Sequence, residues 1–168
     1  MAIQVRSYQD ADCAAVGNLI AATYSRYNLG FAPEDQQAKL LGPFQHARSE
    51  QPAHQAEIAR AILAPTVLVA VAGDEVVGVL RGRPGRLHSL FVREDYHRQG
   101  VGRLLMRRFE AESAAHGVTQ ITLASSLYAV PFYRAIGYTR STGLRSMKSF
   151  GTPGLLVQPM KKLLQAGE

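Results

Sequence analysis

The sequence predicts an α+β or mixed α/β fold in which helices flank a central sheet. Residues 66–92 contain three apolar strand patterns, separated by a Gly-Asp and a Pro-Gly turn signal. A helical apolar pattern over residues 101–116 then leads into another apolar strand pattern at residues 120–126. Because a hairpin runs into strand, helix and strand, this order argues against a uniform doubly wound sheet.

The first elements are a strand and a helix. Residues 3–9 alternate apolar and polar side chains, which predicts a half-buried strand. Asp10 or Asp12 can then cap a helix that runs to about Tyr27. The stretch NLGFAP, residues 28–33, ends this helix because glycine and proline disfavour its continuation.

Residues 34–63 are also predicted to be helical, before the strand patterns begin. This helical stretch is interrupted near residues 42–44 and near Pro52. No catalytic motif stands out in the region. We therefore expect it to cover the sheet or one side of a binding site.

The C-terminal part predicts a short helix followed by two strands. Residues 128–138 form the short helix, since Pro131 is tolerated in a first turn and Gly137 ends the helix. The strands are expected near residues 142–150 and 154–163, divided by the turn sequence GTPG.

Composition indicates a single soluble globular domain over residues 1–168, since 46% hydrophobic and 19% charged residues are ordinary values. No run of about 18 apolar residues occurs, so no membrane span is expected. The first residues lack the order of a signal peptide. Cys13 is the single cysteine, which excludes a disulfide framework and a cysteine-based zinc cluster. We expect a cytoplasmic protein without a bound metal.

The charge favours anionic partners. Nineteen Lys and Arg residues against thirteen Asp and Glu residues give a formal net charge of +6, and arginine is prominent in residues 81–108. The sequence does not indicate nucleic acid as the partner, because no basic run with interleaved aromatic residues is present. A small phosphorylated ligand suits a local arginine cluster equally well. As a third interpretation, the arginines are solvated surface residues without a partner.

The stretch HRQGVGRLLM, residues 97–106, places two glycines at the beginning of a helix. A phosphate-binding P-loop is excluded because this stretch has no lysine followed by Ser or Thr, and a dinucleotide fingerprint lacks its third glycine. A helix start still offers unpaired N–H groups and partial positive charge, and Arg98 and Arg103 flank this one. From these residues alone, an anion site and an ordinary tight turn both stay open.

The wider context of residues 86–140 narrows these alternatives. An L-F-V strand, a short loop, a G-x-G opening a helix, a further strand and an F-Y-x-x-x-G-Y segment follow one another. This linked set resembles the core of the GCN5-related N-acetyltransferase superfamily, and the rest of the chain follows that fold's order more loosely. The resemblance implies a central, mostly antiparallel sheet flanked by helices, and binding of acetyl-coenzyme A as co-substrate.

The resemblance also implies a cofactor site. The family signature is [QR]-x-x-G-x-[GA]; Gly100 and Gly102 match it, whereas His97 departs at the first position. The departure removes no backbone donor, so we expect binding to persist and His97 to be a surface loop residue. In the family the backbone of this loop cradles the pyrophosphate, and the preceding strand pairs with the pantetheine arm. The implied cofactor-binding residues are Leu90, Phe91, Val92, Arg98, Gln99, Gly100, Val101, Gly102, Arg103 and Ser126.

Two residues are candidates for catalysis. Tyr133 matches the tyrosine with which family members often protonate the thiolate leaving group, although it can instead pack beneath its helix. His88 lies on the strand leading to the site and is a candidate general base, a core or surface histidine being the alternative. Many family members recruit a base through water. Ser126, where the family often has asparagine, can bond the cofactor or cap the short helix.

We therefore expect direct N-acetylation of a primary amine, without an acyl-enzyme. A CoA-binding sensor without turnover, an O-acyl or longer-acyl transferase and a nucleic-acid-binding domain are the alternatives. Acceptor specificity is expected from residues 20–55 and from the last hairpin. An apolar or aromatic pocket can be lined by Tyr24, Tyr27, Phe31 and Phe44, with packing as the alternative role for at least two of them. A homodimer is common in the family.

Overall fold

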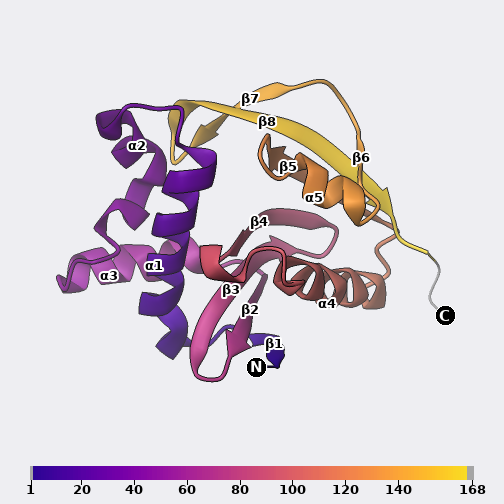
Figure 1. The fold of residues 1–168 in the computed structure, drawn as a ribbon, viewed down its shortest axis with the longest axis horizontal. Coiled ribbons are helices and arrows are strands. Elements are labelled where there is room, and N and C mark those ends of the chain that lie inside the picture. Colours follow the sequence, from indigo (N-terminus) through magenta and orange to yellow (C-terminus); the bar gives the residue numbers. More distant parts are fainter. Residues whose placement is uncertain (1, 166–168) are drawn as a thin grey trace.

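The computed structural model describes residues 2–165 and contains one eight-stranded sheet with helices on both faces (Figure 1). In chain order the elements are β1 (Ile3–Ser7), η1 (Asp10–Asp12), α1 (Cys13–Thr23), η2 (Tyr24–Asn28), α2 (Glu34–Leu41), η3 (Gly42–His46), α3 (Pro52–Ile62), β2 (Thr66–Ala72), β3 (Glu75–Arg83), β4 (Arg86–Val92), η4 (Glu94–Tyr96), α4 (Val101–Ala115), β5 (Gln120–Ser126), α5 (Val130–Ala135), β6 (Thr139–Arg140), β7 (Arg145–Ser149) and β8 (Thr152–Leu163). The mixed α/β fold expected from the sequence is confirmed.

The sheet is antiparallel at all described strand pairs except one. The strand order is β1-β2-β3-β4-β5-β8-β6, and β7 pairs with β8. The exception is β4 with β5, which are parallel and pair at the single register Arg86 to Thr122. The two strands therefore diverge toward their carboxyl ends, and the sheet is open between them.

A β-bulge lies in β4, next to this opening. Arg81 of β3 pairs with Ser89, and the next residue of β3, Gly82, pairs with Leu87. His88 is thus an extra residue on β4 with no partner on β3. A bulge of this kind bends its strand and re-aims side chains, so β4 changes direction where it begins to leave β5.

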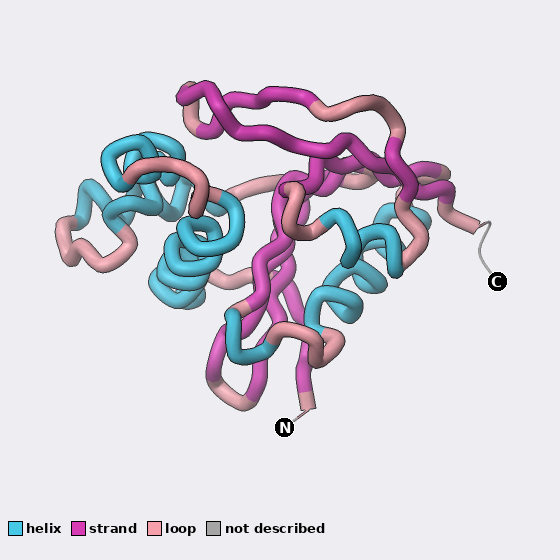
Figure 2. The backbone as a smooth tube through the Cα atoms, turned by 45° about the horizontal axis from the view of Figure 1, so that its top comes forward, coloured by secondary structure: helices cyan, strands magenta, loops and turns pink. Residues whose placement is uncertain are grey.

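Each face of the sheet has its own hydrophobic core. Helix α4 carries its apolar residues at helical spacing, so one side of it packs on the sheet together with α5. Helices α1, α2 and α3 cover the opposite face. Figures 1 and 2 show the two helical groups on either side of the strands, with the β7–β8 hairpin arching over the opening. The buried apolar residues of α4 are Val101, Leu105, Met106 and Phe109.

The structure differs from the sequence-based expectation in three local details. The first helix ends as α-helix at Thr23 and continues as the π-helical turn η2. The two-residue strand β6 pairs with β8 and has no periodicity that a sequence could reveal. Strand β8 begins at Thr152, so it includes most of the GTPG sequence expected to be a turn. Within residues 2–165, no helix is long and apolar enough to cross a membrane.

Candidate functional site

A cavity of about 1050 Å³ lies where β4 and β5 diverge. One wall consists of β4, the loop after it, the first turn of α4, the end of β5 and α5. The other wall consists of α1, η2, Phe44 and the β7–β8 hairpin. The cavity thus crosses the sheet, because its lining includes residues from the helices on both faces.

The loop at the mouth of the cavity presents a row of free backbone donors. Gly100 has φ of 82° and precedes the first residue of α4, and Arg98 has φ of 61°. Among the described residues, none accepts a hydrogen bond from the amides of residues 98–103; the next amide, that of Leu104, bonds to the Gly100 carbonyl at 3.0 Å. Six consecutive N–H groups are therefore available to an anionic ligand, at the positive end of a helix dipole.

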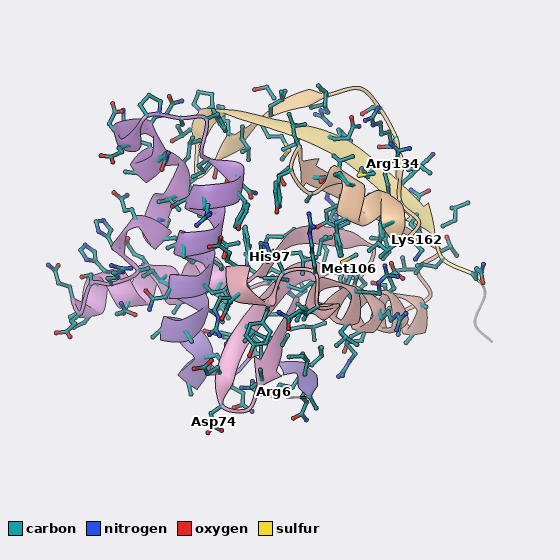
Figure 3. The ribbon with its side chains drawn as sticks, viewed as in Figure 1. Arg6, Asp74, His97, Met106, Arg134 and Lys162 are labelled. Carbon is teal, nitrogen blue, oxygen red and sulfur yellow. The ribbon has the colours of Figure 1, made fainter. Side chains whose placement is uncertain are left out.

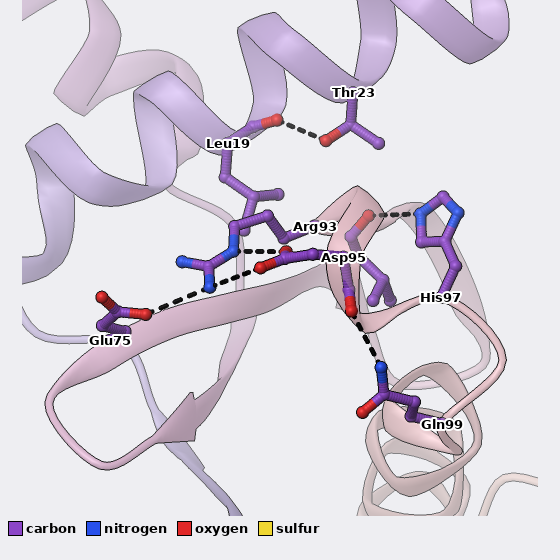
Figure 4. A network of polar contacts seen from close by, with 8 residues as sticks. Leu19, Thr23, Glu75, Arg93, Asp95, His97 and Gln99 are labelled. Carbon is purple, nitrogen blue, oxygen red and sulfur yellow. Dashed lines mark hydrogen bonds and ion pairs between the residues drawn. The ribbon is translucent and has the colours of Figure 1, made fainter.

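Short polar contacts hold this loop in place (Figure 4). An imidazole nitrogen of His97 lies 2.6 Å from the Val92 carbonyl oxygen. The side-chain amide of Gln99 donates to the Asp95 carbonyl at 2.8 Å, and the Asp95 carboxylate pairs with Arg93 at 2.7 Å. His97 is half-buried and packs against the Tyr27 ring, with 4.9 Å between ring centroids, beside the beginning of α4 (Figure 3). His97 therefore connects the loop to β4 and to η2. This structural role differs from the surface loop position expected from the sequence.

The edge of β4 that faces the cavity also has free backbone groups. The amide of Arg93 donates to the Val77 carbonyl of β3 at 2.8 Å. Since backbone groups alternate in direction along a strand, those of Leu90 and Val92 face away from β3, toward the gap. The Val92 carbonyl accepts the His97 contact, and the remaining groups have no strand beside them because β5 has diverged. An extended ligand could pair with this edge as a strand would.

Glycine is favoured at the two loop positions for different structural reasons. A Cβ at Gly100 would meet nothing within 4 Å, but its positive φ favours glycine. A Cβ at Gly102 would lie 3.1 Å from Cζ of Phe132 on α5. Gly102 thus allows α5 to pack closely on α4, a role that the sequence did not indicate.

Positive charge is concentrated at the mouth. Arg98 and Arg103 both line the cavity and are exposed, and neither forms an ion pair within residues 2–165. Arg103 also borders a second cavity of about 460 Å³ between α4 and the region after α5. The mouth is therefore suited to a ligand with several negative charges.

Tyr133 lies deep in the cavity and is only 5% exposed. Its hydroxyl forms no hydrogen bond with another described residue. In the described part of the chain, every fully buried side-chain oxygen or nitrogen has a hydrogen-bond partner, so this hydroxyl cannot be fully buried. The hydroxyl therefore opens into the cavity. Burial raises the pKa of Tyr133, so the hydroxyl stays protonated and able to donate.

Ser126 and His88 take less central positions. The hydroxyl of Ser126 accepts a hydrogen bond from the Ala129 amide at 3.3 Å, which caps the turn before α5. His88, at the bulge, is exposed and lines the cavity. The ring is nevertheless partly shielded from water, and this desolvation together with the charges of Arg81, Arg83 and Arg86 lowers the pKa of His88, which favours the neutral form that can accept a proton.

The structure brings most of the sequence-predicted site residues to this one cavity. His88 and Tyr133 line it, and Gln99 alone among the implied cofactor-binding residues does not. The cofactor-binding candidates along its wall are Leu90, Phe91, Val92, Arg98, Gly100, Val101, Gly102, Arg103 and Ser126.

The aromatic residues expected near the acceptor divide between two environments. Tyr24, Tyr27 and Phe44 line the cavity, whereas Phe31 lies outside its lining and is 63% exposed. The Tyr24 hydroxyl lies 2.8 Å from the Ser149 hydroxyl, so β7 is bonded to the end of the first helix. The last hairpin, from which acceptor specificity was expected, lines the cavity through Lys148–Phe150, Leu155 and Val157. Sequence reasoning named none of these residues and missed Arg81, because they belong to no motif.

Within the described residues, no group of three or more His, Cys, Asp or Glu side chains is arranged to hold a metal ion. Cys13 does not line the cavity. The groups that the cavity offers for chemistry are therefore backbone amides, hydroxyls, phenols, imidazoles and several cations.

Several solved structures have a similar fold. A GCN5-related N-acetyltransferase from Rhodopseudomonas palustris has a TM-score of 0.77 and 22% identity, over 98% of this chain and 97% of that one. The PaiA N-acetyltransferase of Thermoplasma acidophilum, solved with coenzyme A, has a TM-score of 0.71 and 17% identity, over 98% and 100%. The yncA protein of Salmonella typhimurium, solved with acetyl-CoA, has a TM-score of 0.61 and 19% identity, over 100% and 96%. At these identities the likeness shows the fold.

The family follows from the sequence comparison. A search of the curated proteins found no match. The family model described as acetyltransferase (GNAT) domain, however, matches residues 32–164, which include the cavity's loop, α5 and the β7–β8 hairpin. The chain therefore belongs to the GNAT family of acetyltransferases.

Proposed function

We propose that the protein transfers an acetyl group from acetyl-CoA directly to a primary amine. The observation that carries this proposal is the row of six unpartnered amides at the mouth of a cavity that extends to the Tyr133 hydroxyl. A diphosphate and a thioester on one long molecule would need both features, at opposite ends of one passage. The relatives solved with coenzyme A and acetyl-CoA support the same ligand.

The residues present suit three parts of acetyl-CoA: the diphosphate, the pantetheine arm and the thioester. The amides of residues 98–103 would bind the diphosphate, and Arg98 and Arg103 add positive charge there. The free edge of β4 at Leu90 and Val92 would pair with the amide groups of the pantetheine arm. Tyr133 lines the cavity deeper between the strands, where the thioester would lie.

The chemistry required of the chain is modest. Acetyl-CoA supplies an activated carbonyl, which the lone pair of the acceptor amine attacks. As the C–S bond breaks, the Tyr133 hydroxyl donates a proton to the departing sulfur, so coenzyme A leaves as a thiol. The proton lost from the amine passes to water or to the neutral imidazole of His88. No cysteine lines the described cavity, which favours direct transfer over an acyl-enzyme.

Two measurements test this function. Isothermal titration with CoA, acetyl-CoA, ATP and NAD should show binding of the first two only. A thiol-release assay with amines and alcohols, supplied with acetyl-, propionyl- and longer acyl-CoA, should show turnover with acetyl-CoA and an amine. CoA binding without thiol release would indicate a sensor, and preference for alcohols or longer chains would indicate another acyl transferase. Absence of CoA binding would overturn the proposal.

The homodimer and the cytoplasmic location remain proposals that rest on the resemblance and on composition. Sedimentation equilibrium at several protein concentrations tests the dimer, which should persist in the low micromolar range. Fractionation of the cells that make the protein tests the location.

A further inference from the structure

We propose that the acceptor amine also carries an anionic group, a carboxylate or a phosphate, and that Arg81 and Lys148 bind it. The inference rests on the proposed function, and it names the class of amine that reaches the cavity from the side of α1 and the β7–β8 hairpin. The evidence is the charge of the cavity wall, the bonding of Arg81 and the cations around it.

No aspartate or glutamate lines the cavity among the described residues. Four cations do: Arg98 and Arg103 at the mouth, and Arg81 and Lys148 elsewhere. The first two lie beside the amides proposed for the diphosphate. Arg81 comes from β3 and Lys148 from β7, and a second negative group would match their charges.

Arg81 is placed apart from the diphosphate loop. A guanidinium N–H lies 3.4 Å from the hydroxyl of Ser89, three residues before the end of β4. Three residues of strand span about 10 Å, and the loop begins only after that. Arg81 and the amides of residues 98–103 therefore serve different regions of one cavity.

The bonding of Arg81 leaves donors free. Its Nε donates to the Ile62 carbonyl at 2.7 Å, while the contacts to Ser89 and to the Leu63 carbonyl are long, at 3.4 and 3.5 Å. The contacts to Ile62 and Leu63 cap the carboxyl end of α3, and together with the Ser89 contact they use three of five N–H groups, one on each nitrogen, so that each terminal nitrogen keeps one free N–H. The remaining donors form the planar fork that binds a carboxylate or phosphate through two oxygens.

Arg81 also lacks a counter-ion. None of the ion pairs among residues 2–165 includes Arg81 or Lys148. Arg81 is half-buried, and burial lowers the pKa of its guanidinium, which reflects the cost of removing that charge from water. An anionic acceptor would offset this cost.

Further cations surround this part of the cavity. The charges of Arg81, Arg83 and Arg86 all lower the pKa of His88. Those of Arg83 and of Arg145 on β7 lower the pKa of Arg86. None of the four arginines forms an ion pair in the described part of the chain. The resulting positive potential disfavours a polyamine, and it favours the neutral form of an entering amine, which is the nucleophile.

The wall formed by α1, η2, Phe44 and the β7–β8 hairpin carries several aromatic side chains. Tyr24, Phe44 and Phe150 line it, and the Tyr24 hydroxyl is already bonded to Ser149. An acceptor with an amine, an anionic group and an apolar or aromatic portion matches these surroundings. An amino acid with a large side chain has all three features.

Matched pairs of acceptors isolate the anionic group. Phenylalanine and leucine are compared with their carboxamides, and glucosamine 6-phosphate with glucosamine, so that the two arms separate carboxylate from phosphate; spermidine is the cationic probe. We expect kcat/KM at saturating acetyl-CoA to be about tenfold or more higher for the anionic member of at least one pair. Equal values across all pairs, or a preference for spermidine, would overturn the inference while leaving acetyl transfer intact.

Variants then test the residues. Lys148 is exposed, so Lys148→Glu should fold normally, raise KM for the anionic acceptor about tenfold and leave its carboxamide within about twofold. Arg81→Lys keeps the charge but loses the fork and should reduce the same ratio. Lys161→Glu is the control, because Lys161 is exposed on β8 and does not line the cavity. An unchanged ratio of anionic to neutral acceptor in both cavity variants would contradict the assignment, and a folding defect alone would not move that ratio.

A binding readout keeps the inference testable if no acceptor in the panel turns over. Isothermal titration of the same amines into the protein saturated with CoA should show binding of the anionic members, weakened by Lys148→Glu and not by Lys161→Glu. No binding of any anionic amine would overturn the inference. Failure of CoA itself to bind would instead overturn the proposed function, together with the inference built on it.

Discussion

The ring of Phe132 occupies the space that a side chain at position 102 would need. A Cβ added at Gly102 would lie 3.1 Å from Cζ and 3.2 Å from Cε2 of that ring. Phe132 in turn packs edge-on against Tyr133, with 5.0 Å between the ring centroids. The beginning of α4, which presents the free amides, is thus in direct contact with the helix that carries the phenol proposed as proton donor.

Enlarging residue 102 should destabilise the protein through Phe132. We expect Gly102→Val to lower the free energy of unfolding by about 1–3 kcal/mol, because the extra methyl groups overlap the ring. In a Gly102→Val, Phe132→Leu double variant, the loss should be smaller than the sum of the two single losses. Urea unfolding of the four proteins measures this coupling, and strictly additive losses would show that the two residues do not interact.

A negative charge at position 102 should weaken coenzyme A binding beyond any effect of shape. Gly102→Asp and Gly102→Asn introduce side chains of nearly equal size, so both disturb Phe132 alike. The aspartate should raise the Kd for CoA about tenfold more than the asparagine, since its charge repels the diphosphate, and the difference should shrink as salt is added. Equal Kd values at low salt would place the diphosphate elsewhere.

Removal of the Tyr133 hydroxyl should affect chemistry more than binding. We expect Tyr133→Phe to lower kcat by about a hundredfold or more, because general acid catalysis contributes on that scale. Its Kd for CoA should stay within about twofold of the wild-type value. Tyr138→Phe is the matched control: its hydroxyl bonds to Glu110 at 2.8 Å and it does not line the cavity. Equal kcat in the Tyr133 variant and the wild type would remove Tyr133 from the mechanism.

The pH dependence should follow the amine and not the phenol. Burial raises the pKa of Tyr133 above its ordinary value of about 10, so the hydroxyl remains protonated throughout the neutral and mildly alkaline range. The ratio kcat/KM should therefore rise with pH as the acceptor loses its proton, without a decline below about pH 10. A decline at lower pH that disappears in Tyr133→Phe would indicate that the phenol ionises far more easily than its burial implies.

An ion pair near the N-terminus should make stability depend on pH. Asp12 is bound by both terminal nitrogens of Arg6, at 2.8 and 2.9 Å, and accepts from the Gln9 amide at 2.8 Å. The hydrogen bond from Arg6 lowers the pKa of Asp12. This stabilisation is complete above the unfolded pKa of about 3.9 and is lost as pH falls through the folded value.

Substitution of Asp12 measures that contribution. Asp12→Asn should lower the free energy of unfolding by about 1–2 kcal/mol at pH 7, and the gap to wild type should close below about pH 4. Asp10→Asn is the control, since Asp10 is exposed and forms no ion pair among the described residues. A gap that is the same at pH 7 and pH 3 would mean that the loss arises from packing and not from charge.

Most elements could be predicted from the sequence because their signals are local. The alternation of β1, the hairpin turn between β2 and β3 and the helical face of α4 each depend on neighbouring residues alone. The bulge at His88 could not be predicted, because it results from how β3 and β4 pair. For the same reason, no local pattern could predict that β8 lies between β5 and β6.

The candidate site divides in the same way. The loop of free amides could be anticipated, since a glycine with positive φ at a helix start is a local feature. The packing of Phe132 on Gly102 and the approach of Lys148 to the cavity involve segments far apart in the chain. The acceptor side was consequently the part that sequence reasoning described least well.

A crystal structure of the complex with coenzyme A tests the proposed diphosphate site most directly. Oxygens of the diphosphate should lie about 3 Å from backbone nitrogens of residues 98–103, with the sulfur near the Tyr133 hydroxyl. Coenzyme A bound elsewhere, or no binding at millimolar concentration by a well-folded sample, would contradict it.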